Sequence, residues 1–140
     1  MLDFFTFTHF KKSPSLLHAV TTKSNDLPYA FSLALHTGEN VDNIIANRNR
    51  LSSLLQSNAS LHYIVANQTH SDNIKVITQQ ETKGWESLSD AIEDCDALIT
   101  DLKGVVLTVL TADCVPILLY DKHKERLSHP LVSCWVITLM

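Results

Sequence analysis

Cys114 and its neighbour Asp113 stand in a segment that otherwise looks like protein core. Residues 105–121 read VVLTVLTADCVPILLYD, and the residues on either side of the Asp-Cys pair are the aliphatic residues of buried strands. A core excludes a carboxylate unless it is paired or hydrogen-bonded, so we expect residues 111–114 to form a strand-end loop facing a cleft. An inert, buried Cys114 is the alternative, since cysteine is often a small core residue.

Two histidines lie in similar polar loops. His70 belongs to NQTHSD, and His36 belongs to HTGEN. Either one can be an ordinary solvated side chain, and the His36 loop is also placed to present backbone donors to an anion at a helix N-terminus. If Cys114 and His70 share a metal, a thiolate and an imidazole favour zinc, with copper second. A catalytic zinc takes three protein ligands, so this pair lacks its third.

These side chains need strands and a helix to position them. Apolar residues recur at helical spacing over residues 41–56, with Asn40 placed as the N-cap and Asp42 near the positive end of the helix dipole. Short apolar runs predict extended segments at 16–22, 31–35, 64–66, 74–77, 95–100, 104–110 and 115–120, with a helical turn or two around residues 88–92. The fold class expected is α+β, a layered mixed α/β sandwich.

Composition limits the function classes. The chain has 140 residues, 45% of them hydrophobic, and a net charge of -4, which predicts a single globular domain with no electrostatic footprint for nucleic acid or anionic lipid. The N-terminus inverts the order of a secretory signal, and no apolar run reaches the roughly 20 residues of a membrane span. Three cysteines without CxxC spacing argue against a disulfide framework. We therefore expect a cytoplasmic protein with a small-molecule ligand and no membrane partner.

Three segments together resemble one family. Residues 33–51 (LALHTGENVDNIIANRNRL), 67–77 (NQTHSDNIKVI) and 96–121 (DALITDLKGVVLTVLTADCVPILLYD) are similar to the YfiH-type purine nucleoside phosphorylases, long known as laccase-domain or polyphenol oxidase proteins. The third segment is the most specific, and the resemblance covers about residues 16–126.

The resemblance implies a site. In this family the residues matching His70 and Cys114 bind zinc together with a later histidine in a His-Ala-Gly-Trp-Arg-Gly motif. The implied partners are phosphate and a purine nucleoside (adenosine, inosine, guanosine or methylthioadenosine), and the implied activities are phosphorolysis and adenosine deamination. Arg48, in the family's Asn-Arg pair, is the candidate basic group for phosphate, with His36 as a second pocket residue. Asp113 is the nearest acid for proton transfer. A surface role for Arg48 and a loop-bracing role for Asp113 remain open.

The chain departs from the family after Arg126. Where His-Ala-Gly-Trp-Arg-Gly is expected, the sequence reads LSHPLVSCWVITLM, and His129 lies outside any matching context. We therefore expect residues 1–126 to be the N-terminal part of one domain, residues 127–140 to be a divergent tail, and the chain to be a truncated or frameshifted family member. Two ligands without a third predict weak zinc binding and little catalysis, and exposed sheet edges predict self-association.

Three other functions stay open. The first is that the chain is a non-catalytic fragment. The second is a metal-free enzyme with Cys114 as nucleophile and His70 as base. The third is the copper-dependent polyphenol oxidase of the family's older name. Chelators separate the second from the zinc enzyme, because a thiol enzyme survives metal removal.

Overall fold

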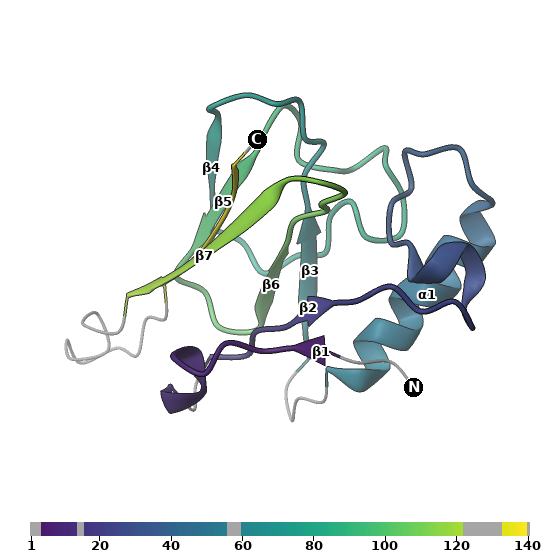
Figure 1. Ribbon diagram of the computed structural model, residues 1–140. Coiled ribbons are helices and arrows are strands. Elements are labelled where there is room, and N and C mark those ends of the chain that lie inside the picture. Colours follow the sequence, from purple (N-terminus) through teal and green to yellow (C-terminus); the bar gives the residue numbers. More distant parts are fainter. Residues whose placement is uncertain (1–3, 14–15, 56–59, 122–132, 140) are drawn as a thin grey trace. The chain divides into compact units, whose positions relative to one another are not determined.

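The computed structural model describes residues 4–13, 16–55, 60–121 and, for the backbone, 133–139 (Figure 1). The chain divides into two compact units, Met1–Gln56 and Ser57–Met140. Within the described residues, no helix combines the length and the apolar character needed to cross a membrane. Among the described residues, more lie in strands than in helices. The α+β class expected from the sequence is confirmed.

The first unit opens with a short antiparallel hairpin. β1 (Phe4–Phe5) pairs with β2 (Val20–Thr21), with Phe4 opposite Thr21. The strand predicted at 16–22 is thus only two residues long. The residues before it are engaged differently, because the backbone N–H of Phe7 donates to Nε2 of His18 at 2.9 Å, next to the 3-10 helix η1 (Phe10–Lys12). The Phe10 ring meets the His18 ring edge-on, with centroids 5.2 Å apart.

The helix α1 (Val41–Leu54) confirms the predicted helix and its cap. Oδ1 of Asn40 accepts a hydrogen bond from the backbone N–H of Asn43 at 3.1 Å, as an N-cap should. The helix packs on the 3-10 helix η2 (Pro28–Phe31). Among the described residues of this unit, the buried apolar side chains are Phe31, Leu33, Ile44 and Leu51.

The segment before α1 differs from the extended strand predicted at 31–35. Tyr29, Ala30 and Phe31 have φ values of 52°, 52° and 68°, a left-handed conformation that non-glycine residues rarely adopt. Contacts from α1 hold this turn, because Nδ2 of Asn47 donates to the carbonyl oxygens of Pro28 and Ser32, both at 2.9 Å. A polar helix residue, buried to 2% exposure, has therefore overridden the local extended preference.

Among the described residues of the second unit, six strands form two sheets. β3 (His62–Val65) pairs in parallel with β6 (Val105–Thr108). The other sheet has the order β4-β5-β8-β7, in which β4 (Ile74–Ile77) and β5 (Ala97–Thr100) are parallel. β8 (Ser133–Leu139) runs antiparallel to both β5 and β7 (Val115–Asp121).

The core of this unit lies where strands of both sheets meet. Its fully buried members include Ile64 of β3 and Leu98 of β5, packed with Ile77 and Cys95. A helical turn or two is expected around residues 88–92, but the structure has no helix there. One hydrogen-bonded turn forms, closed by Ala91 N–H on the Leu88 carbonyl at 3.2 Å. Isolated parallel bridges join Ile64 to Lys83 and Ala66 to Ile92. These bridges satisfy backbone donors and acceptors of β3 and of the residue after it that β6 leaves unpaired.

The tail contributes a strand. Residues 127–140 were expected to diverge from the family, and within them β8 inserts between β5 and β7, with Ile99 opposite Trp135 and Leu119 opposite Trp135 on the other side. The β-branched and aromatic composition of this stretch suits a central strand. His129 lies outside the described residues.

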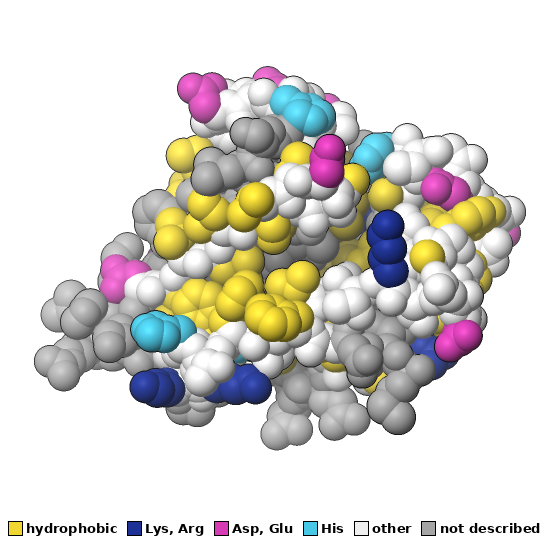
Figure 2. Space-filling view, viewed as in Figure 1, with side chains coloured by type: hydrophobic (Ala, Val, Ile, Leu, Met, Phe, Trp, Pro, Cys, Tyr) yellow, Lys and Arg dark blue, Asp and Glu magenta, His cyan; other side chains and the backbone are white. Residues whose placement is uncertain are grey.

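The edge strand β4 is the basis of a prediction on self-association. Ile74 and Val76 point to the same face and are 55% and 63% exposed, and Figure 2 shows hydrophobic side chains at the surface over this sheet. An exposed apolar edge strand is a template for pairing with another chain, and a lysine there opposes pairing. We expect Val76→Lys to shift the protein toward monomer in sedimentation velocity at matched concentration. Thr78→Lys, just past the strand, is the charge control, and equal oligomerisation of both variants would contradict the prediction.

Candidate active site

The loops that carry His70 and Cys114 follow two neighbouring parallel strands. β3 ends at Val65, which is paired in register with Thr108 at the end of β6. The carboxyl ends of parallel strands meet at one edge of a sheet, and ligands of α/β proteins gather at such edges. The backbone N–H of Leu110 donates to Oε1 of Gln68 at 2.9 Å and so ties the two loops together. The expected strand-end loops are present, and the two candidate ligands lie on neighbouring loops.

His70 is held in a strained backbone conformation. Its φ is 63°, which costs a non-glycine residue about 1–2 kcal/mol and persists only where surrounding contacts enforce it. The side chain of Asp96 contacts the backbone on both sides of His70 and at His70 itself. Its Oδ1 accepts from His70 N–H at 3.2 Å, and its Oδ2 accepts from the N–H groups of Thr69 and Ser71 at 3.2 and 2.8 Å.

Asp96 is a buried anion with a complete set of donors. The residue is 3% exposed, and the Ser71 hydroxyl adds a fourth hydrogen bond at 2.8 Å. Burial alone would raise the pKa of the Asp96 carboxyl, but the hydrogen bonds from Ser71, Thr69 and His70 outweigh it and leave the pKa below its usual value. Asp96 is not among the site residues expected from the sequence. The available signal was an acid placed directly before the apolar strand ALIT, which is the argument already applied to Asp113.

Asp113 and Cys114 lie directly before β7 (Val115–Asp121) and differ in exposure. Cys114 is half-buried and Asp113 is exposed, and the Cys114 Sγ is 3.9 Å from Oδ1 of Asp113. That separation is a weak contact, so the thiol is not locked into a strong hydrogen bond by its neighbour. The inert, fully buried alternative for Cys114 does not describe this position. It describes Cys95, which is 0% exposed and donates to the Ala97 carbonyl at 2.9 Å.

The two cysteines are expected to differ in reactivity. Burial raises the pKa of the Cys95 thiol, and the thiolate is the reactive form. We expect iodoacetamide to modify Cys114 in the native protein at least about 100-fold faster than Cys95, measured by mass spectrometry of the separate peptides. Denaturant should remove the difference. Equal rates in the native protein would show that the core around Cys95 is open.

Arg48 and His36 lie in the first unit. Arg48 is 0% exposed, and its Nε and Nη2 donate to the Leu33 carbonyl at 2.8 and 2.6 Å, so the alternative of a surface arginine is wrong. Desolvation by burial lowers the pKa of its guanidinium to about 10, which leaves it charged at neutral pH. His36 is exposed in the loop between this braced segment and α1. Arg48 thus stabilises the backbone that leads to His36.

The donor set fits zinc in kind. His70 and Cys114 offer one imidazole nitrogen and one thiolate sulfur, both common zinc ligands. Within the described part of the chain, no three His, Cys, Asp or Glu side chains gather closely enough to hold a metal. The described residues therefore provide two ligands of the right chemistry and no complete cage.

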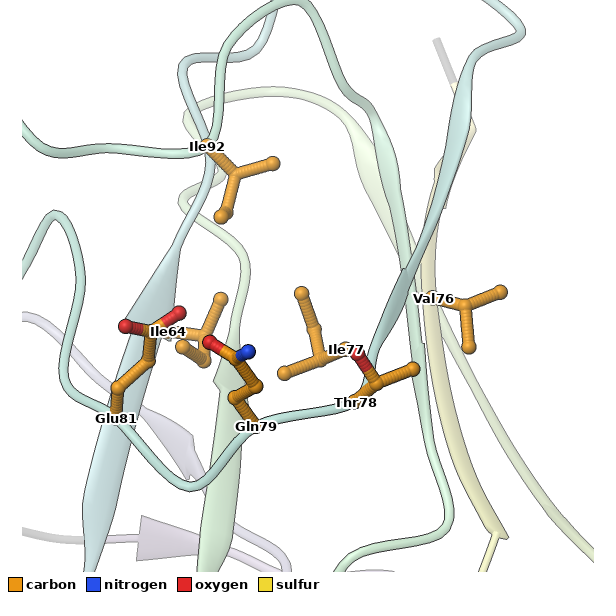
Figure 3. Close-up of a pocket in the computed structure, with 7 residues that line it drawn as sticks. All are labelled: Ile64, Val76, Ile77, Thr78, Gln79, Glu81 and Ile92. Carbon is orange, nitrogen blue, oxygen red and sulfur yellow. The ribbon is translucent and has the colours of Figure 1, made fainter.

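A cavity of ≈ 140 Å³ lies elsewhere in the second unit. Figure 3 shows Ile64, Ile77 and Ile92 pointing toward one another, with Gln79 and Glu81 beside them. Sites for small organic ligands usually have volumes of about 300 Å³ or more, so this cavity is too small for a nucleoside. None of the five candidate residues lines it, so it is separate from the His70 and Cys114 loops.

Comparison with known proteins places the chain in a family. A family model described as multi-copper polyphenol oxidoreductase laccase matches residues 18–129, and the chain belongs to that family. The resemblance noted in the sequence is confirmed by relatives named purine nucleoside phosphorylase. One from Corynebacterium glutamicum is 38% identical over 95 residues, which cover 67% of this chain and 36% of the relative.

Two further matches show the range of names and the fold. A protein named adenosine deaminase, from an unknown prokaryotic organism, is 40% identical over 76 residues, covering 53% of this chain and 29% of the relative. The crystal structure of the Bacillus licheniformis hypothetical protein YfiH aligns with a TM-score of 0.69 at 24% identity, covering 86% of this chain and 44% of that one. The chain therefore has the YfiH fold and spans less than half the length of these three proteins.

Proposed function

We propose that this chain carries the His70 and Cys114 portion of a zinc-dependent site for purine nucleoside phosphorolysis. The observation that supports it is the placement of an imidazole and a half-buried thiol on loops that follow two adjacent parallel strands and are tied by the Leu110 to Gln68 hydrogen bond. The names of the relatives support the reaction class. Zinc, when bound, supplies a Lewis acid beside the nucleoside.

The residues of the chain divide into ligands and supporting groups. His70 and Cys114 bind the metal, and the Asp96 hydrogen bonds keep the His70 loop in one conformation. Exposed His36 contributes to phosphate binding. We expect Arg48 to act by stabilising the segment from Leu33 toward His36, because its own guanidinium already donates twice to Leu33. Its earlier assignment as a direct phosphate ligand remains a competing prediction.

Adenosine deamination is a second candidate activity, favoured by the relative named adenosine deaminase. Deamination requires an acid that moves protons to and from the purine and water. We assign this role to the carboxylate of Asp113, which is exposed and lies 3.9 Å from the Cys114 sulfur. Asp113→Asn should therefore reduce deamination of adenosine more than phosphorolysis of inosine, with both rates measured on the same zinc-loaded sample.

Zinc binding is the first test of the proposed function. Purified chain is titrated with zinc in competition with a chromophoric chelator, and His70→Ala and Cys114→Ser are compared with the wild type. Loss of a direct ligand should weaken zinc binding more than the roughly 10- to 100-fold seen for supporting residues. His9→Gln, an exposed histidine of the first unit, is the control and should leave affinity unchanged. Equal affinity in all four proteins would contradict the proposal.

Phosphorolysis is measured as hypoxanthine released from inosine in the presence and absence of phosphate. We expect a low rate that depends on phosphate, is abolished in His70→Ala and Cys114→Ser, and is removed by a chelator. A rate that survives the chelator but not Cys114→Ser would instead identify a metal-free thiol enzyme. Tight zinc binding without any phosphorolysis would favour the non-catalytic fragment.

A further inference from the structure

One carboxylate organises the whole His70 loop. Three consecutive backbone N–H groups, those of Thr69, His70 and Ser71, point at the side chain of Asp96, which lies about 25 residues further along the chain. The same short segment closes both ends of the loop, because Cys95 N–H donates to the Asn67 carbonyl and Asp96 N–H donates to the Asn73 carbonyl, at 3.3 and 3.2 Å. The loop therefore has its ends fixed by backbone contacts and its centre fixed by Asp96.

We propose that Asp96 is the positioning residue for His70: it forces the left-handed backbone that aims the imidazole, and thereby sets metal affinity without touching the metal. The inference rests on the proposed function for its metal readout. Convergent amides satisfied by a buried anion form a rigid cradle, and supporting contacts of this kind are what hold a ligand in its productive orientation. An unsupported His70 would relax to negative φ, because left-handed φ is unfavourable for histidine.

Asp94 provides a matched control. It is also a carboxylate on the 93–97 segment, but its oxygens accept hydrogen bonds from the side chains of Thr69 and Asn73 and from no amide of residues 69–71. If metal binding needs only negative charge beside the loop, substitutions of Asp94 and Asp96 should have equal effects on metal affinity. If metal binding needs the hydrogen bonds between Asp96 and the amides of residues 69–71, only substitutions of Asp96 should lower metal affinity. Comparing the two residues therefore distinguishes an effect of charge from an effect of positioning.

The test uses cobalt as a spectroscopic substitute for zinc in the full 140-residue chain. Asp96→Ala removes all four hydrogen bonds, whereas Asp96→Asn keeps an acceptor for part of the cradle. We expect cobalt affinity to fall by about 10- to 100-fold in Asp96→Ala and by less in Asp96→Asn, with altered ligand-field bands in both. Asp94→Asn should stay within about twofold of the wild type in affinity and keep the wild-type spectrum.

Amide hydrogen exchange supplies a readout that needs no metal. Exchange at residues 69–71 should accelerate in Asp96→Asn and Asp96→Ala while that of the β3 core amides stays unchanged. If Asp96→Ala does not fold, the Asn variant carries both measurements. Wild-type affinity and spectrum in a folded Asp96 variant, or unchanged exchange at residues 69–71, would overturn the inference. If instead His70→Ala binds cobalt as well as the wild type, the proposed metal site fails, and the exchange result alone decides whether Asp96 positions His70.

Discussion

Gly84→Ala is expected to lower the free energy of unfolding by about 3 kcal/mol or more, from two costs that add. Gly84 has a φ of 69°, a conformation unfavourable for alanine. A Cβ at this position would also lie 2.5 Å from the Val65 carbonyl oxygen and 3.0 Å from the Val65 Cβ, so the backbone must shift. Because Val65 is the last residue of β3, the shift reaches the strand that leads into the His70 loop.

Gly38→Ala is the matched control for this prediction. Gly38 also has a positive φ, 84°, but no atom lies within 4 Å of the added Cβ. Its cost should be only the backbone term, about 1 kcal/mol. Urea unfolding gives both values, with one probe for each unit. Trp85 fluorescence reports the second unit, which contains Gly84, because this buried indole stacks on Tyr63 with ring centroids 4.3 Å apart. Circular dichroism of α1 reports the first unit, which contains Gly38. Similar losses of stability in the two variants would mean that the close contact between the added Cβ and Val65 does not destabilise the protein.

Arg48→Ala is expected to lower the free energy of unfolding by about 3 kcal/mol, measured by circular dichroism of α1. The substitution removes two charge-assisted hydrogen bonds to Leu33, leaves that carbonyl without these donors and opens a cavity beneath the helix. Arg50→Ala, two residues further along α1 and exposed, should change the stability by less than about 0.5 kcal/mol. Comparable losses would show that burial of Arg48 contributes nothing.

The Arg48 prediction also separates two roles. If Arg48 contacts phosphate directly, Arg48→Lys should raise the KM for phosphate while the fold stays intact. If it stabilises the 33–36 segment, as its contacts with Leu33 indicate, Arg48→Lys should lose stability first, because a lysine offers a point charge instead of the planar donor pair. Parallel measurements of the unfolding midpoint and the phosphate dependence decide between these outcomes.

The sequence by itself determined the helix α1, the strand β4 and the family. Apolar periodicity and the Asn40 cap specified α1, because helical hydrogen bonds and capping join residues three or four apart. β4 at Ile74–Ile77 was also predicted with its observed bounds. The loops after β3 and β6 were recognised by their polar residues, and the segments around His70 and Cys114 carried the resemblance that the family match confirmed.

Only the tertiary structure decided how those loops are held. The parallel pairing of β3 with β6 joins residues about 43 apart, such as His62 and Val105, and strand periodicity does not specify its partner. The buried roles of Asp96 and Arg48 likewise depend on hydrogen bonds across 26 and 15 residues. The residue type alone does not show whether a polar side chain faces water or accepts hydrogen bonds from buried amides. Its partners exist only once the chain has folded, which is why Asp96 was missed and the surface alternative for Arg48 was wrong.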